Sequence, residues 1–173
     1  MTALYSPFDG TSAPTEPRLE FVFEIQAEFD RMDTIPDLPS GHGRGFVSLS
    51  GGKVTGPHLN GVIVPHTGGD WAMFRPDEVL SSDARYLLET DDGTKILMLN
   101  RGYVWGRQPD TMERMRDWMF RDGPPLDFEE FYLRSSPSFE APKGRYEWMM
   151  RHIFIGIGRR QKHGNTIRYY ALL

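Results

Sequence analysis

With 173 residues, of which 39% are hydrophobic and 13% aromatic, the chain is long enough for one domain with a full core. Its net charge of -4 argues against nucleic acid and anionic membrane surfaces as partners. The absence of cysteine excludes disulfides, thiolate nucleophiles and cysteine-ligated metal centres.

Residues 1–17 carry three prolines among Ser, Thr and Gly, which predicts a flexible arm ahead of a domain over residues 18–173. The arm has no basic segment followed by an apolar one, and nowhere in the chain do about 18 apolar residues follow one another. We therefore expect a cytoplasmic protein with no membrane partner.

The domain begins with a clear strand pattern. Residues 19–29 alternate between apolar and polar side chains. Phe21 and Phe23 are therefore expected to point to the interior, and Glu20 and Glu24 to solvent.

Short strands continue along the chain. Phe46 begins a strand that is expected to turn back at residues 50–53, in a hairpin. Further strands are predicted over residues 59–64, 71–75, 128–133, 152–159 and 166–173. Residues 144–150 favour one helical turn.

The strongest local signal is a hairpin over residues 83–105. Asp92-Gly93 is typical of a two-residue type I′ turn, which would pair Asp91 with Thr94. Because side chains alternate with period two, this register assigns one set of residues to a single inward face. The set is Ala84, Tyr86, Leu88, Leu97, Leu99, Arg101 and Tyr103.

A helix interrupts the strands within residues 109–125. Asp110 and Glu113 have the spacing of a capping box, and Gly123 with two prolines ends the helix. Its apolar stripe consists of Met112, Met115, Trp118 and Met119. We hypothesise that this insertion is a lid over a barrel mouth; the alternative is a contact with a second subunit.

About eight strands, with turns at this spacing, predict an all-β fold: a single antiparallel β-barrel with a short helical insertion. A closed barrel removes exposed sheet edges and leaves room inside for one small ligand.

Tyr86, Arg101 and Tyr103 form the first candidate site, because they end an otherwise apolar face. The Arg101 guanidinium matches a carboxylate or an enolate, and a tyrosine hydroxyl can donate a proton to a polarised carbonyl. The alternative is that Arg101 closes an ion pair with a core carboxylate while the tyrosines cap the barrel.

Two further segments add candidates. Asp70 follows a Gly-Gly turn, where it could act as a general base at the mouth; the alternative is an Asx-turn residue. Trp71 beside it is a substrate contact or a core residue. Arg134 could supply a second anion contact before a turn forced by Pro137, or form a surface ion pair.

Metal and nucleotide sites are not favoured. His58, His66 and Asp70 lie close in sequence, but without the spacing that places two imidazoles on one metal. The glycine-rich pieces lack the helix that would receive a phosphate, and the basic run over residues 159–163 is interpreted as a solvated hairpin tip. We therefore expect no cofactor and no metal.

A set of motifs then resembles a known family, the domain of unknown function 3237, over residues 18–172. The motifs are, in order, Gly56-Pro57 with Gly61, Gly68-Gly69-Asp70-Trp71, Asp83-Ala84-Arg85-Tyr86, Thr90-Asp91-Asp92-Gly93, Asn100-Arg101-Gly102, Arg134-Ser135-Ser136-Pro137-Ser138-Phe139-Glu140 and Tyr146-Glu147-Trp148.

The resemblance implies a small antiparallel β-barrel that pairs into a homodimer, with no activity shared across the family. It also implies that Asp70, Tyr86, Arg101 and Arg134 occupy positions that the family pattern carries. The helical segment is longer than expected of shorter members, so a common substrate does not follow.

The first functional hypothesis is a cofactor-independent enzyme, a lyase, isomerase or cyclase, that acts on a small, partly aromatic carbonyl or carboxylate compound. Arg101 and Arg134 would bind the anion or developing enolate. Tyr86 or Tyr103 would donate a proton and Asp70 would be the base. The second hypothesis is a non-catalytic binder of a hydrophobic small molecule, and the third a structural dimer.

Overall fold

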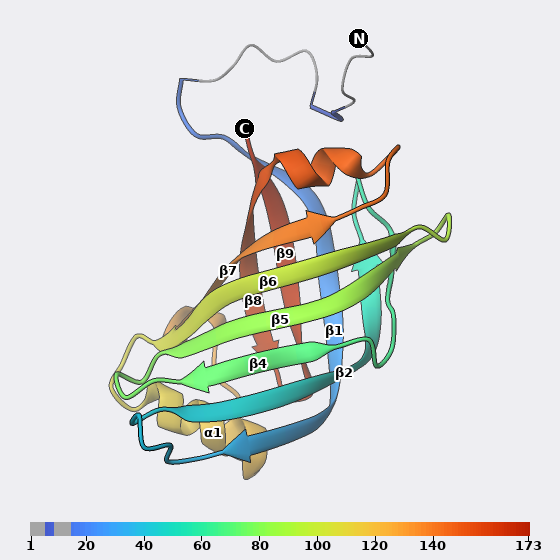
Figure 1. Cartoon of the computed structure of the whole chain (residues 1–173). Coiled ribbons are helices and arrows are strands. Elements are labelled where there is room, and N and C mark those ends of the chain that lie inside the picture. The colour runs from blue at the N-terminus through green and yellow to red at the C-terminus, as the bar shows by residue number, and fades with distance from the viewer. Residues whose placement is uncertain (1–5, 9–14) are drawn as a thin grey trace.

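The structure is a computed structural model and describes residues 6–8 and 15–173, so most of the arm predicted for residues 1–17 lies outside the described residues. Within them, nine antiparallel strands form one sheet that closes into a barrel (Figure 1). The strands are β1 (Leu19–Ile35), β2 (Gly43–Thr55), β3 (Gly61–Ile63), β4 (Gly69–Phe74), β5 (Leu80–Thr90), β6 (Lys95–Gly106), β7 (Phe131–Glu140), β8 (Ile153–Gln161) and β9 (Gly164–Leu172).

The barrel has eight strand positions, because β3 and β4 share one of them. Both strands pair with β2 on one side and with β5 on the other. β4 pairs with the first half of β2 and β3 with the second half. The pairing of β1 with both β2 and β9 closes the circle, which confirms the predicted barrel.

The prediction of a hairpin turn at residues 50–53 is wrong, because β2 continues through these residues as one strand. Gly51 and Gly52 have φ of 148° and 153° and lie within the strand. A Cβ on Gly52 would come within 2.3 Å of the Gln26 carbonyl oxygen of β1. The glycines therefore let β2 bend where it passes from β4 to β3, instead of turning the chain back.

The proline-forced turn at Pro137 is also wrong, since β7 continues to Glu140. The ladder between β7 and β8 consists of two residue pairs and ends at Ser135. Pro137 lies beyond that ladder, where β7 pairs with β6 alone, so its missing N–H is tolerated as it is on an edge strand.

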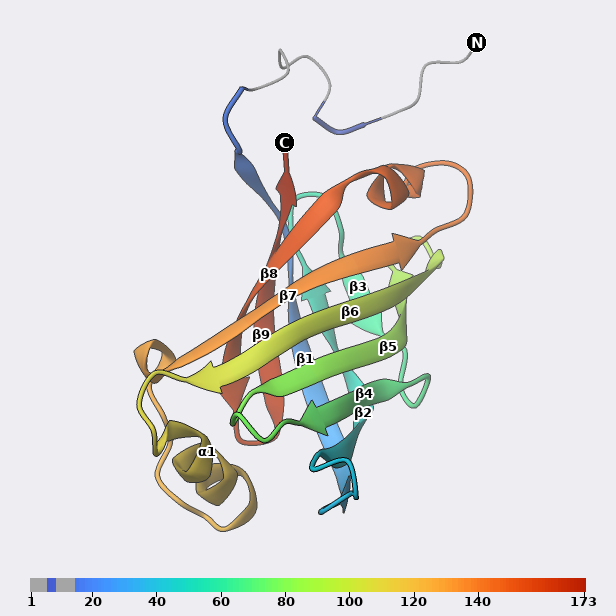
Figure 2. The same cartoon turned by 60° about the vertical axis from the view of Figure 1, so that its left-hand side comes forward.

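The helix α1 (Thr111–Phe120) lies at one end of the barrel, away from the C-terminus (Figures 1 and 2). Met112, Met115 and Trp118 are buried, as the predicted stripe requires. The capping box is wrong: the Asp110 side chain makes no cap hydrogen bond and its backbone is helical. Two short 3-10 turns, η1 (Phe128–Glu130) and η2 (Glu147–Arg151), flank β7.

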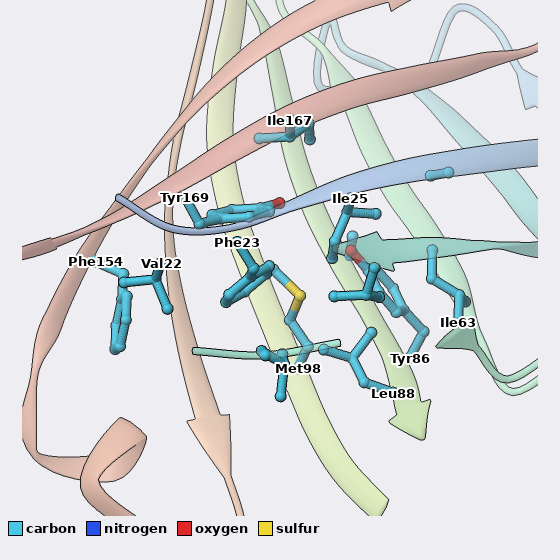
Figure 3. Packing of buried hydrophobic residues seen from close by; sticks show 14 of the residues in the cluster. Val22, Phe23, Ile25, Ile63, Tyr86, Leu88, Met98, Phe154, Ile167 and Tyr169 are labelled. Atoms are coloured by element: carbon cyan, nitrogen blue, oxygen red, sulfur yellow. The ribbon is translucent and has the colours of Figure 1, made fainter. Parts of the chain in front are cut away.

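Packed side chains fill the barrel at the end away from α1. Phe23, Met98 and Tyr169 converge there from β1, β6 and β9 and are 0% exposed (Figure 3). Phe154 and the buried Trp148 of η2 extend this core and close the end. One half of the lumen is therefore filled by side chains, and the cavity that could hold a ligand lies in the half beneath α1.

The β5–β6 register differs from the predicted one by one residue. Thr90 pairs across the turn with Thr94, and Asp91-Asp92-Gly93 form a three-residue loop in which Gly93 has φ of 81°. Such loops place a left-handed residue at their end. A shift of one residue moves a whole strand's side chains to the opposite face.

The faces of β6 are consequently exchanged. Ile96, Met98 and Asn100 point to the interior beside Tyr86, whereas Leu97, Leu99, Arg101 and Tyr103 point outward. On β1, Phe23 lies inside as expected, but a register shift near Val22 leaves Phe21 outside against Tyr170.

This register predicts that Met98→Ala is far more destabilising than Leu99→Ala, although the two residues are neighbours. Truncating a fully buried methionine leaves a cavity and should lower the free energy of unfolding by about 2–5 kcal/mol. Leu99, half-buried on the outer face, should cost about 1 kcal/mol or less. Urea denaturation of the two variants provides the measurement, and equal losses would contradict the register.

Candidate active site in the barrel lumen

A cavity of about 120 Å³ lies between the packed half of the lumen and α1. Its walls are mainly apolar and aromatic, with Phe29 of β1 and Leu133 of β7 among them. Met112, Met115 and Met119 of α1 cover it from outside. The cavity also has a few polar groups: Asp70, Tyr86, Asn100, Ser135, Arg160 and Asn165.

Asp70 reaches the cavity because β4 is wedged tightly between its neighbours. A Cβ on Gly68 would lie 1.8 Å from the Arg85 carbonyl oxygen, and one on Gly69 would lie 2.3 Å from that of Val47. The two glycines therefore let β4 enter between β2 and β5. The next residue, Asp70, points inward and lines the cavity.

The Asp70 carboxylate is poorly hydrated but oriented. Burial raises its pKa from 3.8 to about 6, while a hydrogen bond from the Asp83 N–H to Oδ1 (2.8 Å) and the charge of Arg160 both act in the opposite direction. A carboxyl group with such a pKa changes protonation near neutral pH, as a general acid or base must.

Arg160 of β8 is one of three arginines on the cavity lining, together with Arg116 and Arg134. Burial lowers its pKa from 12.5 to about 10, so it stays charged at neutral pH, and the charge of Asp70 acts against this lowering. Nη1 donates to Asn165 Oδ1 (3.1 Å), and the guanidinium lies 4.9 Å from the Phe29 ring centre. No ion pair within 4.0 Å joins Arg160 to Asp70 among the described residues, and its Nε has no hydrogen-bond partner there.

Polar groups from four strands form the floor of the cavity, next to the packed core. Asn100 Nδ2 donates to the hydroxyl of Tyr169 (3.0 Å), which lies beside Tyr86 and Ser135. Burial raises the pKa of both tyrosines, so their hydroxyls keep their protons and act as donors.

Three of the predicted site residues do come together, but on the outer face of the barrel. Arg101, Tyr103 and Trp71 line an external groove of about 430 Å³. Trp71 is 58% and Tyr103 is 53% exposed, and Arg101 pairs with the Asp83 carboxylate at 3.4 Å. Placing Arg101 with Tyr86 in one pocket was therefore wrong, because the register was displaced by one residue. Tyr103 also touches the rim of the inner cavity.

Arg134 lies at the rim of the cavity, not deep inside it. Its guanidinium stacks over Phe128 and Tyr132, with 5.6 and 5.1 Å to the ring centres. Nη1 donates to the Leu133 carbonyl oxygen. The side chain is held by these contacts, although the residue contributes to the lining.

Sequence reasoning missed Arg160 and Asn100. Arg160 belongs to the basic run interpreted as solvated, yet period two along β8 places it on the same face as Phe154, Gly156 and Gly158, which are buried. That alternation was the available signal. Asn100 lies in one of the family motifs, but the displaced register assigned it to the outside.

Neither a metal cluster nor a membrane-spanning helix is present in the described part of the chain. Its His, Asp and Glu side chains form no group of three or more that could hold a metal ion. None of its helices has the length and apolarity needed to cross a bilayer.

The fold and site define a small closed β-barrel with a partly buried carboxylate and guanidinium around one cavity. The chain belongs to the family described as "Protein of unknown function (DUF3237)", whose model matches residues 17–172, which confirms the resemblance. It is 32% identical to a UPF0311 protein of Rhodopseudomonas palustris (strain TIE-1), over 91% of this chain and 99% of that one.

Two further comparisons extend this. A crystal structure of a protein with unknown function from Clostridium acetobutylicum ATCC 824 is similar with a TM-score of 0.81 at 28% identity, covering 92% of this chain and 99% of that chain. The hydroalkoxylation enzyme phnH of Penicillium herquei is 34% identical over 88 residues, which are 50% of this chain and 56% of that one.

Replacing Asp70 by asparagine should stabilise the fold at neutral pH. A raised pKa means that ionisation disfavours the folded state: the effect is absent below the unfolded pKa near 4 and complete above the folded pKa of about 6. The difference of 6 − 3.8, at about 1.4 kcal/mol per unit, gives up to about 3 kcal/mol. The amide oxygen introduced by Asp70→Asn would still accept from the Asp83 N–H.

The measurement is urea denaturation of Asp70→Asn and the unaltered protein at pH 4 and pH 8. The variant should gain stability at pH 8 and almost none at pH 4. Glu28→Gln, which alters an exposed carboxylate on β1, is the control. A gain that is the same at both pH values would contradict the buried, poorly hydrated carboxylate.

Proposed function

We propose that this protein is a cofactor-independent enzyme of the lyase, isomerase or cyclase kind, acting on a small, partly aromatic carbonyl or carboxylate compound. Asp70 moves the proton and Arg160, in place of the Arg101 predicted from the sequence, stabilises the negative charge. The observation that carries the proposal is the arrangement of these two groups in one apolar cavity without a direct ion pair between them.

Asp70 is the base in this proposal. With a pKa of about 6 it is mostly ionised at neutral pH, yet basic enough to accept a proton from a carbon or oxygen acid. Tyr86 lines the same cavity, and the charge of Asp70 contributes to the rise of its pKa. Its raised pKa keeps the hydroxyl protonated, which suits a donor to the oxygen of a carbonyl group.

Arg160 supports the reaction by its charge. Proton removal next to a carbonyl places negative charge on oxygen, and a fixed guanidinium in an apolar cavity stabilises that charge more than water does. The hydrogen bond to Asn165 and the contact with Phe29 hold Arg160 in place before substrate arrives. This pre-orientation is what electrostatic catalysis requires.

The comparison with the hydroalkoxylation enzyme favours the same chemical class. Hydroalkoxylation adds an O–H bond across a carbon–carbon double bond, so a proton leaves oxygen and another reaches carbon with no net redox change. An acid–base pair in a dry cavity serves such a reaction. For this chain the likeness supports acid–base catalysis without specifying a substrate.

The alternative is a non-catalytic binder of a hydrophobic small molecule. The methionines that α1 presents to the cavity favour it, because methionine adapts to ligands of different shape. In that case Asp70 and Arg160 would only orient the ligand.

Residence in the cytoplasm and a homodimeric state stay predictions from the sequence.

Proton exchange tests catalysis directly. Small aromatic ketones such as 4-hydroxyacetophenone are incubated with the protein in D₂O, and NMR measures deuterium incorporation next to the carbonyl. We expect exchange to fall by roughly 10²- to 10⁴-fold in Asp70→Asn. In Arg160→Met, loss of a charge-assisted contact should lower it by about 10- to 150-fold.

Arg101→Met is the matched control, because it removes a guanidinium from the outer groove and should leave exchange unchanged. Exchange that is equally fast in the unaltered protein and in Asp70→Asn would contradict the proposed role of the carboxylate. Binding without exchange in any ketone would favour the non-catalytic alternative.

We further propose that α1 is a lid that opens to admit ligand. Two ion pairs connect its segment to the barrel: Arg116 with Glu78 (2.9 Å) in the β4–β5 turn, and Asp122 with Lys162 in the β8–β9 turn. Exposed pairs contribute up to about 1 kcal/mol each. Glu78→Gln with Asp122→Asn should therefore raise the off-rate of bound 4-hydroxyacetophenone by roughly 2- to 10-fold.

NMR relaxation dispersion measures that off-rate. Asp77→Asn is the control, because Asp77 forms its ion pair with Arg75 inside the same turn. Unchanged off-rates in the double variant would contradict a lid held by these pairs.

A further inference from the structure

Asn100 is a buried amide whose side-chain oxygen is left without a hydrogen-bond partner among the described residues. It is 5% exposed, and its Nδ2 donates to the Tyr169 hydroxyl. Among the described residues, no donor reaches its Oδ1. In this arrangement the amide nitrogen faces the Tyr169 hydroxyl and Oδ1 is left as the free acceptor.

Packing does not account for an asparagine at this position. The inward residues before it on β6 are Ile96 and Met98, both fully buried. An apolar residue of similar volume would continue that series without stranding a buried acceptor, which is among the costly defects of a protein interior. The difference is that Asn100 borders the cavity, whereas the other two lie in the core.

Arg160 offers the complementary group on the same cavity. Its Nε is a buried donor with no partner among the described residues, and Nη1 is occupied by Asn165. One cavity is thus lined by two residues that each carry an unpaired buried polar atom: Asn100 of β6 with an acceptor and Arg160 of β8 with a donor. The volume of about 120 Å³ is close to that of engineered cavities that hold one benzene ring.

We propose that the substrate is a hydroxyaryl carbonyl compound and that Asn100 selects it: Oδ1 accepts a hydrogen bond from the ligand hydroxyl, while Arg160 donates to the carbonyl or carboxylate oxygen. This inference rests on the proposed function, since the ligand occupies the same cavity. Asn100 is then a specificity residue that binds the end of the substrate away from the reacting carbonyl.

A site built around an unpaired acceptor discriminates strongly against analogues without a donor. 4-Hydroxyacetophenone and 4-methylacetophenone have nearly the same shape, and only the first can donate to Oδ1. In the unaltered protein the hydroxyl compound should bind about 5- to 140-fold more tightly, which corresponds to about 1–3 kcal/mol. Isothermal titration calorimetry measures both affinities.

Asn100→Leu should remove or reverse that preference, with the methyl compound binding at least as well as the hydroxyl compound. Arg101→Leu changes the next residue, which faces outward, and should keep the preference of the unaltered protein. Thermal denaturation establishes that each variant is folded. The comparison of the two ketones in the unaltered protein needs no variant, so it stays decisive if Asn100→Leu does not fold.

Equal affinity for the two ketones, or no binding of either, would overturn the proposal, as would an unchanged preference in folded Asn100→Leu. If Oδ1 binds only a water molecule, the protein should bind the two ketones with equal affinity. Failure of the proposed function is distinct: a hydroxyl preference that depends on Asn100 but no deuterium exchange would retain this inference and contradict catalysis. Deuterium exchange that depends on Asp70 but occurs equally in ketones without a hydroxyl would retain catalysis and contradict the role of Asn100.

Discussion

The interior of this barrel depends on the register of β5 and β6, and a loop of three residues sets that register. Gly93 adopts a left-handed conformation, its N–H donates to the Thr90 carbonyl oxygen (2.8 Å), and the Thr94 N–H donates to Thr90 Oγ1 (3.0 Å). Because side chains alternate along both strands, this loop sends Tyr86 and Asn100 to the lumen together.

The cavity combines groups that an apolar interior disfavours. Asp70 and Arg160 are both partly buried, yet no ion pair within 4.0 Å joins them among the described residues. Each is held by a hydrogen bond with an uncharged group: Asp70 accepts from the Asp83 N–H, and Arg160 donates to Asn165 Oδ1. Such an arrangement lowers stability and prepares charges for a ligand, which is the usual exchange between stability and activity at functional sites.

Strand patterns and turn signals were enough to predict the barrel, and the glycine and proline positions explain where much of the prediction from sequence failed. Alternation identified β1, and the Asp-Gly turn identified β5 and β6, without reference to the other strands. Gly51 and Gly52 resembled a turn because the close approach of β1, which requires glycine there, is a tertiary contact. Pro137 resembled the end of a strand. It is tolerated inside β7 because the β7–β8 ladder ends before it, and this too is a tertiary feature that the local sequence does not show.

The same difference between local sequence signals and tertiary contacts applies to the candidate site. Asp70 was found from the Gly-Gly turn before it and Tyr86 from the inward face of β5, and both border the cavity. Arg101 was assigned to it through a turn type, and a two-residue and a three-residue loop are hard to separate when both contain Asp-Gly. Arg160 was passed over because basic runs at hairpin tips are usually solvated, although the alternation along β8 places it on the inward face.

The central claim is that Asp70 and Arg160 act on each other across one poorly hydrated cavity. The most direct measurement is a ¹³C NMR titration of the Asp70 carboxyl carbon in the unaltered protein and in Arg160→Met. Burial predicts a pKa of about 6, and removal of the neighbouring positive charge should raise the pKa further. A pKa near 4 in the unaltered protein, or one that does not move in Arg160→Met, would contradict it.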